Sequence, residues 1–174
     1  MPESTVIIVG GGAAGLSAAA ALARPGIGAT VLEQDATLGG TWARRYERLH
    51  LHTMREFSGL AHYPIPQRYP QYLSRDDMVA YLNEYARTLD LRIVAGAKVR
   101  RVAARSAEAR TREGEGGGAP DVLDEQGEPR GTAGEPTAFP GLYFVGFTHS
   151  LRGHLFEARR ASLRLAGHIE RYLR

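Results

Sequence analysis

Six residues near the start of the chain have the spacing of a nucleotide-binding loop. Gly10, Gly12 and Gly15 in GGGAAG satisfy the pattern G-x-G-x-x-G. In that pattern the first glycine permits a tight turn, the second lets the backbone approach a pyrophosphate, and the third lets a helix pack closely on a strand. Ala13 and Ala14 would begin the helix, whose free N–H groups and dipole attract phosphate. The pattern alone is weak, so its value depends on the elements around it.

The apolar pattern predicts the elements that must position this loop. Residues 5–9 (TVIIV) are a short β-branched run typical of a buried parallel strand, and residues 13–23 form an Ala- and Leu-rich helix. Residues 29–33 form a second strand, which ends at Glu33. A carboxylate there accepts hydrogen bonds from a ribose and disfavours a 2′-phosphate, so FAD or NAD fits better than NADP. The alternative, a glycine-rich turn without a ligand, is disfavoured by this β-α-β context.

The rest of the chain predicts further α/β elements around that unit. Gly39 and Gly40 begin a turn, and residues 41–49 could form a short helix. Residues 62–70 carry three prolines and predict an irregular loop. Ser74 and Asp77 make a capping box for a helix over 75–89. Short strands are predicted at 91–94, 98–103 and 142–145, a turn at 125–127, and a last helix over 152–172. The sequence thus predicts an α/β fold, a Rossmann-like domain with a central parallel sheet and a C-terminal helix.

Motifs beyond the loop resemble those of a known family. GGTW at 39–42, RRYERLHLHTMREF at 44–57, YPIPQRYPQYLSRDDMVAYLNEYA at 63–86 and PGLYFVGFT at 140–148 resemble the flavin-containing monooxygenases. The likeness is closest to the plant indole-3-pyruvate monooxygenases and their bacterial relatives, and it covers roughly residues 1–103 and 121–174. The motifs are specific in combination. The segment from Gly153 to the ARR at 158–160 departs from the family, because relatives have a few more residues there.

The resemblance implies FAD as the cofactor. His52 occupies the position where relatives carry an Asn or His beside the flavin ring, and it is the expected catalytic residue; as a titratable donor it could hydrogen-bond a flavin peroxide. The alternative is that His50 and His52 are ordinary polar residues on a half-exposed segment. The expected cofactor-binding residues are Gly10, Gly12, Ala13, Ala14, Gly15, Glu33, Gln34, Gly40, Thr41, Trp42, Leu49, His52, Gly146, Phe147 and Thr148.

The resemblance also implies a reaction. In the family NADPH reduces the flavin, oxygen adds at its C4a position, and the hydroperoxide oxygenates a small organic substrate. We therefore expect a minimal FAD-dependent oxidoreductase of this kind. The alternative is a non-catalytic or degenerate flavin-binding module, or a subunit completed by another chain.

The segment 104–138 is too short for the family's second dinucleotide-binding domain. A single βαβ unit already takes about 30 residues, and the glycines at 114–118 have a charged segment before them and Pro120 after them. We expect residues 1–174 to form one FAD-binding domain, with 104–138 a flexible linker that replaces the inserted NADPH domain. NADPH binding is therefore doubtful, and electrons would come from a partner reductase or a non-standard donor.

Composition bounds the remaining function classes. The 174 residues include no cysteine, which excludes thiolate metal ligands and a thiol redox pair, and the histidines do not form a convincing metal site. No apolar run approaches the roughly 20 residues of a membrane span. Residues 151–174 hold six arginines and two glutamates, which we interpret as a solvated helix face rather than a nucleic-acid site. We expect a cytoplasmic protein without membrane or nucleic-acid partners, either alone, with a partner subunit, or as a homo-oligomer.

Overall fold

The computed structural model describes residues 5–102, 122–126, 128–147 and 153–174. These residues form a three-stranded parallel sheet and five helices, with the strands in the order β1-β2-β3. The elements in chain order are β1 Val6–Val9, α1 Ala13–Ala23, β2 Ala29–Leu32, α2 Gly40–Ala43, α3 Arg55–Ser58, α4 Arg75–Thr88, β3 Ile93–Val94 and α5 His154–Leu173. The predicted fold class is confirmed.

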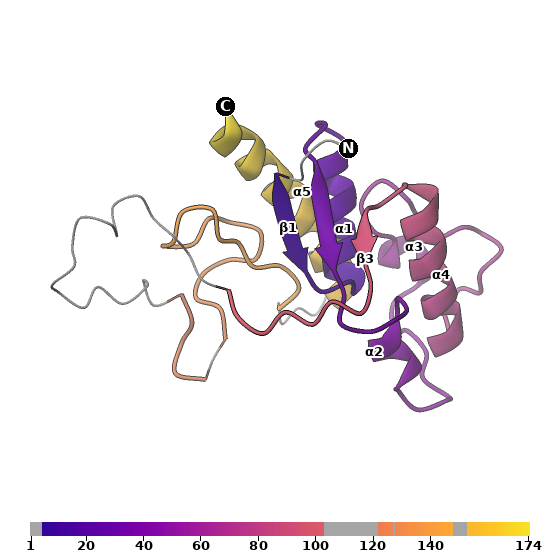
Figure 1. Cartoon of the computed structure of the whole chain (residues 1–174). Coiled ribbons are helices and arrows are strands. Elements are labelled where there is room, and N and C mark those ends of the chain that lie inside the picture. Colours follow the sequence, from indigo (N-terminus) through magenta and orange to yellow (C-terminus); the bar gives the residue numbers. More distant parts are fainter. Residues whose placement is uncertain (1–4, 103–121, 127, 148–152) are drawn as a thin grey trace, which may run out of the picture.

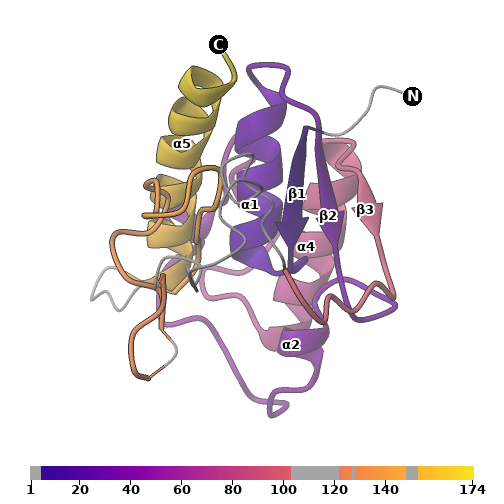
Figure 2. The same ribbon diagram turned by 60° about the vertical axis from the view of Figure 1, so that its left-hand side comes forward.

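The sheet is covered by helices on one face. Ile8 of β1 is paired in register with Val31 of β2, and both are buried against α1. Figures 1 and 2 show α1 and α5 on this face, whereas no helix of the described residues crosses the opposite face. Ile7 and Val9 point the other way and are each 57% exposed. The continuous apolar run of β1 is therefore buried on one face only.

Helix α1 is the centre of the molecule. Nine of its eleven residues are buried, which is unusual for a helix and follows from its position between the sheet and α5 (Figure 2). Alanines let both neighbours approach closely, and Leu16 and Leu22 fill the remaining space without exposure. On α5, the sequence predicts a buried face of Leu155, Ala158, Leu165, Ile169 and Tyr172. The first four are buried, whereas Tyr172, in the last turn, is 60% exposed, so the prediction is wrong at that residue.

Helix α4 begins as the sequence predicts. The Ser74 hydroxyl accepts a hydrogen bond from the Asp77 N–H at 3.1 Å, and the Asp77 carboxylate accepts one from the Ser74 N–H at 3.0 Å. Its buried face carries Tyr81 and Tyr85, whose hydroxyls donate to the carbonyls of Tyr63 and Ala61. Burial raises the pKa of both phenols well above the usual value. These bonds fix the loop before α4 on the core.

Two predicted strands are wrong. Residues 98–102 form no strand, and residues 142–145 contribute a single antiparallel bridge between Tyr143 and Pro136. Apolar runs this short become strands only when a neighbouring strand supplies the ladder, and none of the described strands lies beside them. The predicted turn near Glu125 is present, next to a bridge between Leu123 and Pro129.

The described end of the expected linker contacts the last helix. Ala133 is buried, and its carbonyl accepts a hydrogen bond from Arg164 of α5 at 3.0 Å. A side chain at Gly134 would lie 2.2 Å from the Ala161 carbonyl oxygen, so only glycine fits there. Residues 104–121 and 127 lie outside the described part of the chain. In the described ranges no helix is long and apolar enough to cross a bilayer.

Candidate dinucleotide-binding site

The loop between β1 and α1 has the geometry that its glycines predict. Gly10 adopts a φ of +101°, which only glycine tolerates readily. A Cβ on Gly15 would lie 1.9 Å from the Gly10 carbonyl oxygen, so the helix reaches the loop only because Gly15 lacks a side chain. A Cβ on Gly12, in contrast, would meet no atom within 4 Å. The space over Gly12 is therefore open to a ligand.

The first turn of α1 faces this open space. Gly12 caps the helix without a side chain, and the described residues provide no hydrogen-bond partner for the N–H groups of Ala13 and Ala14. These groups and the positive end of the helix dipole favour a bound anion.

Glu33 lies at the end of β2 and braces the loop. One carboxylate oxygen accepts a hydrogen bond from the Gly11 N–H at 2.6 Å, and the other accepts one from the Asp35 N–H at 2.8 Å. Each oxygen keeps a second lone pair, so the carboxylate can still accept from a sugar hydroxyl. Glu33 thus has a structural role as well as the predicted binding role.

The GGTW segment forms the next wall. Gly39 adopts a φ of +81° and packs against Val79 of α4, which sets the start of α2. A Cβ on Gly40 would lie 2.0 Å from a carboxylate oxygen of Asp35. The same carboxylate forms an ion pair with the Arg44 guanidinium at 2.8 Å. The turn that carries Thr41 and Trp42 is therefore held at both ends.

The segment 49–53 closes a further side. Leu51 donates its N–H to the Leu73 carbonyl at 2.8 Å, and Leu49 accepts from the Arg75 N–H at 2.8 Å. These bonds leave His52 exposed at the wall of the cavity. The His50 ring bonds the Arg48 carbonyl through Nδ1 at 2.9 Å.

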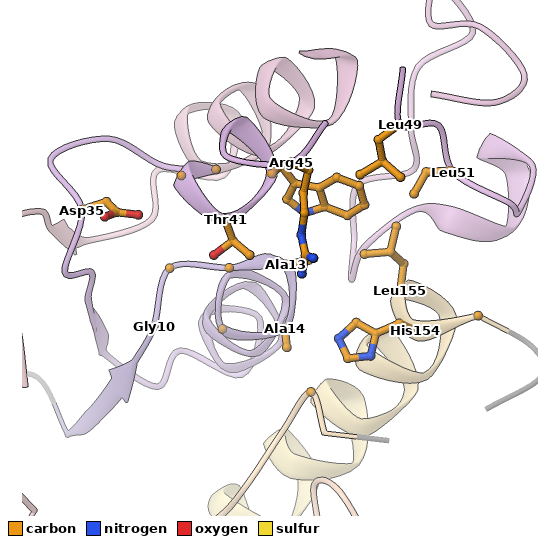
Figure 3. A pocket seen from close by; sticks show the side chains of 18 of the residues that line it. Gly10, Ala13, Ala14, Asp35, Thr41, Arg45, Leu49, Leu51, His154 and Leu155 are labelled. Carbon is orange, nitrogen blue, oxygen red and sulfur yellow. The ribbon is translucent and has the colours of Figure 1, made fainter. Parts of the chain in front are cut away.

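The last wall comes from the far end of the chain. Gly146 has a φ of +87°, and a Cβ there would lie 2.5 Å from that of Ala14. Gly153, with a φ of +94°, packs in the same way against Thr53 and precedes α5. His154 and Leu155, in the first turn of α5, face the cavity (Figure 3). The start and the end of the sequence thus meet at one site.

These segments enclose a cavity of about 640 Å³, within the range of small-molecule sites. Of the residues predicted from sequence, twelve line it: Gly10, Gly12, Ala13, Ala14, Gly15, Glu33, Gly40, Thr41, Trp42, Leu49, His52 and Gly146. Gln34 and Phe147 do not line it, and Thr148 lies outside the described residues. No cluster of three or more metal-ligating side chains occurs in the described ranges.

Several lining residues were not predicted. Asp35, Arg45, Tyr46 and His154 all border the cavity. Asp35 follows Glu33 by two residues and could have been found from the strand end. Arg45 and His154 reach the cavity only through packing of α2 on α4 and of α5 on α1, which no local pattern reveals.

Comparison with known proteins bears on this site. The family model for pyridine nucleotide-disulphide oxidoreductases matches residues 7–113. The chain is 49% identical over 81 residues to the indole-3-pyruvate monooxygenase YUCCA1 of Oryza sativa subsp. japonica, a match that covers 46% of this chain and 20% of that protein. It is 37% identical over 87 residues to the indole-3-pyruvate monooxygenase YUCCA6 of Arabidopsis thaliana, covering 49% of this chain and 21% of that protein.

Solved structures of flavin-containing monooxygenases and related oxygenases are also similar to this chain. A flavin-containing monooxygenase from Stenotrophomonas maltophilia superposes with a TM-score of 0.55 and 32% identity, over 58% of this chain and 31% of that one. S-allyl-L-cysteine S-oxygenase from Allium sativum superposes with a TM-score of 0.51 and 25% identity, over 57% of this chain and 29% of that one. The chain spans about a fifth of the length of the curated relatives and less than a third of these structures.

Proposed function

Because the chain belongs to the pyridine nucleotide-disulphide oxidoreductase family and is similar to flavin monooxygenases, we propose that it binds FAD in this cavity as a minimal FAD-dependent oxidoreductase. The observation that carries the proposal is the open space over Gly12, enclosed by a loop that otherwise admits no side chain at Gly15. A loop that served only as a tight turn would not require glycine at Gly12, where a Cβ would meet no other atom of the protein within 4 Å.

The residues around the cavity fit the parts of FAD. The first turn of α1 would hold the pyrophosphate, and the Glu33 carboxylate would accept from the ribose hydroxyls. Gly40, Thr41 and Trp42 would line the flavin on one side, and Gly146 would lie on the other. Leu49, Leu51 and Leu155 give this end of the cavity an apolar wall (Figure 3), which would limit the access of water to the ring.

FAD, when bound, supplies two-electron redox chemistry and reaction with oxygen. The substrate would be a small organic molecule, as for the oxygenases among the relatives. His52 would serve as a hydrogen-bond donor at the cavity wall.

The proposal is tested by titrating the purified protein with FAD and following flavin fluorescence. The wild-type protein should quench the flavin and retain a yellow chromophore through gel filtration. Gly12→Ala should keep its fold, since the added methyl meets no protein atom, and should bind FAD at least about tenfold more weakly, because the methyl occupies the approach to the phosphates. Protein that stays colourless with excess FAD would overturn the proposal.

A second measurement separates the enzyme from a non-catalytic flavin module. The FAD-loaded protein is reduced chemically without oxygen, and oxygen is then added with candidate small nucleophiles. An oxidoreductase should reoxidise rapidly and transfer oxygen to at least one of them. FAD binding without oxygen transfer would favour the module or subunit alternative.

A further inference from the structure

Arg45 is a charged residue of the cavity wall that the proposed function does not yet use. It follows α2 by two residues, and its guanidinium extends across the cavity toward α1 and His154 (Figure 3). Within the described residues this guanidinium makes no hydrogen bond and no ion pair. Its charge is therefore directed into the cavity without a counter-ion among the residues that the structure describes.

The acidic side chains of the cavity do not neutralise Arg45. Two carboxylates line the described walls, those of Glu33 and Asp35. Glu33 is bonded to two backbone N–H groups, and Asp35 is paired with Arg44. The other titratable groups that line the cavity include His50, His52 and His154, which add positive charge when protonated. The local balance thus favours an anionic ligand near Arg45.

The backbone of Arg45 is held firmly. Its N–H donates to the Trp42 carbonyl at 2.9 Å, and its carbonyl accepts from the Arg75 guanidinium at 3.1 Å. Arg75 belongs to α4, and α2 packs on the same helix. The side chain therefore projects from a fixed base, which reduces the entropy lost when it binds a ligand.

We propose that Arg45 is the counter-ion of the cofactor's pyrophosphate and contacts it from the wall opposite α1. This inference depends on the proposed FAD binding. The N–H groups of Ala13 and Ala14 supply only partial positive charge, whereas the pyrophosphate carries a full negative charge on each phosphate. A guanidinium supplies a permanent charge and a planar pair of donors that match phosphate oxygens. The pyrophosphate would then lie between the helix end and the arginine.

The test compares the FAD dissociation constant of four proteins. Arg45→Met keeps the apolar stem and loses the charge, and Arg45→Lys keeps the charge and loses the planar donors. Arg48→Met is the matched control, because Arg48 is exposed, lies on the same segment and does not line the cavity. We expect Arg45→Met to bind FAD about tenfold more weakly, Arg45→Lys to be intermediate, and Arg48→Met to stay within about twofold of wild type.

Salt dependence is the second readout. The wild-type dissociation constant should rise with sodium chloride, and that of Arg45→Met should rise less, because a screened ion pair has been removed. Thermal unfolding without FAD shows whether each variant keeps its fold. If Arg45→Met does not fold, the FAD affinity of Arg45→Lys relative to wild type tests the role of Arg45. A wild-type protein that fails to bind FAD would sink the proposed function itself. Wild-type binding with equal affinities and equal salt slopes for Arg45→Met and Arg48→Met would overturn the role of Arg45 alone.

Discussion

Two glycines of the same loop are required for different reasons. Gly15 must lack a side chain because the Gly10 carbonyl oxygen occupies the position of its Cβ. Gly12 has no such neighbour, so the protein alone does not require glycine there. In the pattern G-x-G-x-x-G, folding therefore requires glycine at Gly10, through its φ of +101°, and at Gly15, whereas the requirement at Gly12 comes from the proposed ligand.

Gly15→Ala should test the folding constraint. The added methyl must push α1 away from the loop, so the free energy of unfolding should fall by about 1–3 kcal/mol. Urea unfolding followed by circular dichroism measures the change. Gly12→Ala is the control and should remain within about 0.5 kcal/mol of wild type. Equal stability of the two variants would contradict the close packing at Gly15.

Glu33→Gln should test the brace at the end of β2. The amide can replace only one of the two acceptors, so one of the N–H groups of Gly11 and Asp35 loses its partner. We expect the free energy of unfolding to fall by about 1–3 kcal/mol even without cofactor. An apo-protein of unchanged stability would leave Glu33 with a binding role only.

At the scale of elements, one carboxylate joins the proline-containing loop to α4. Glu84 accepts hydrogen bonds from the Tyr63 hydroxyl at 2.5 Å and the Tyr69 hydroxyl at 2.8 Å, and it forms an ion pair with Arg68. The bonded Arg68 guanidinium, followed by the two phenols, lowers the pKa of Glu84 from its ordinary 4.5 to about 2. A single α4 residue thus holds three residues of the loop.

This pKa shift predicts a pH dependence of stability. The folded-state pKa is depressed, so the contribution of Glu84 is complete above about pH 4.5 and is lost as the pH falls toward about 2. Glu84→Gln should lower the free energy of unfolding by about 1–2 kcal/mol near neutral pH and show a smaller loss of stability on acidification. Glu125→Gln, in an exposed turn, is the control. Parallel acid profiles for Glu84→Gln and the control would contradict the interpretation.

How far the sequence predicts the elements depends on whether their signals are local. The helix over 75–88 is predicted within one residue because Ser74 and Asp77 cap it and because apolar residues repeat at helical spacing, namely Met78, Leu82, Tyr85 and Leu89. The strands expected at 98–103 and 142–145 are wrong in the described residues, because a strand needs a partner that the sequence does not specify. The sequence predicts the site loop because its glycine spacing is a local signal. It does not predict Arg45, which reaches the cavity only through the packing of α2 on α4.

At the scale of the molecule, one sheet face carries exposed aliphatic side chains. Ile7 and Val9 are 57% exposed, and Val94 is 45% exposed on the same sheet. Apolar faces of this kind promote association. We expect the protein to self-associate as its concentration rises, and Ile7→Lys to shift sedimentation toward the monomer. Leu163→Lys, at an exposed position of α5, is the control. Monomeric wild-type protein at high concentration would contradict this prediction.

The electron donor is also a property of the whole molecule. The segment 104–138 is too short for a second dinucleotide-binding domain, and we propose that this chain does not bind NADPH. We predict that anaerobic mixing of the FAD-loaded protein with NADPH leaves the flavin absorbance unchanged over minutes, whereas dithionite bleaches it. Rapid bleaching by NADPH would show that this chain binds the dinucleotide.

The pairing of the first helix with the last one sets the order in which the protein can fold. Buried residues of α1, such as Leu16 and Leu22, share their clusters with Leu155, Leu165 and Ile169 of α5. During synthesis on the ribosome, the β1-α1-β2 unit therefore emerges long before α5. The apolar surface of this unit stays exposed to water until α5 covers it. Closure over so long a loop slows folding, but doubling a loop costs only about 0.6 kcal/mol. Insertions between residues 104 and 121, away from the packed residues near Ala133, should therefore alter the folding rate and leave the final stability nearly unchanged.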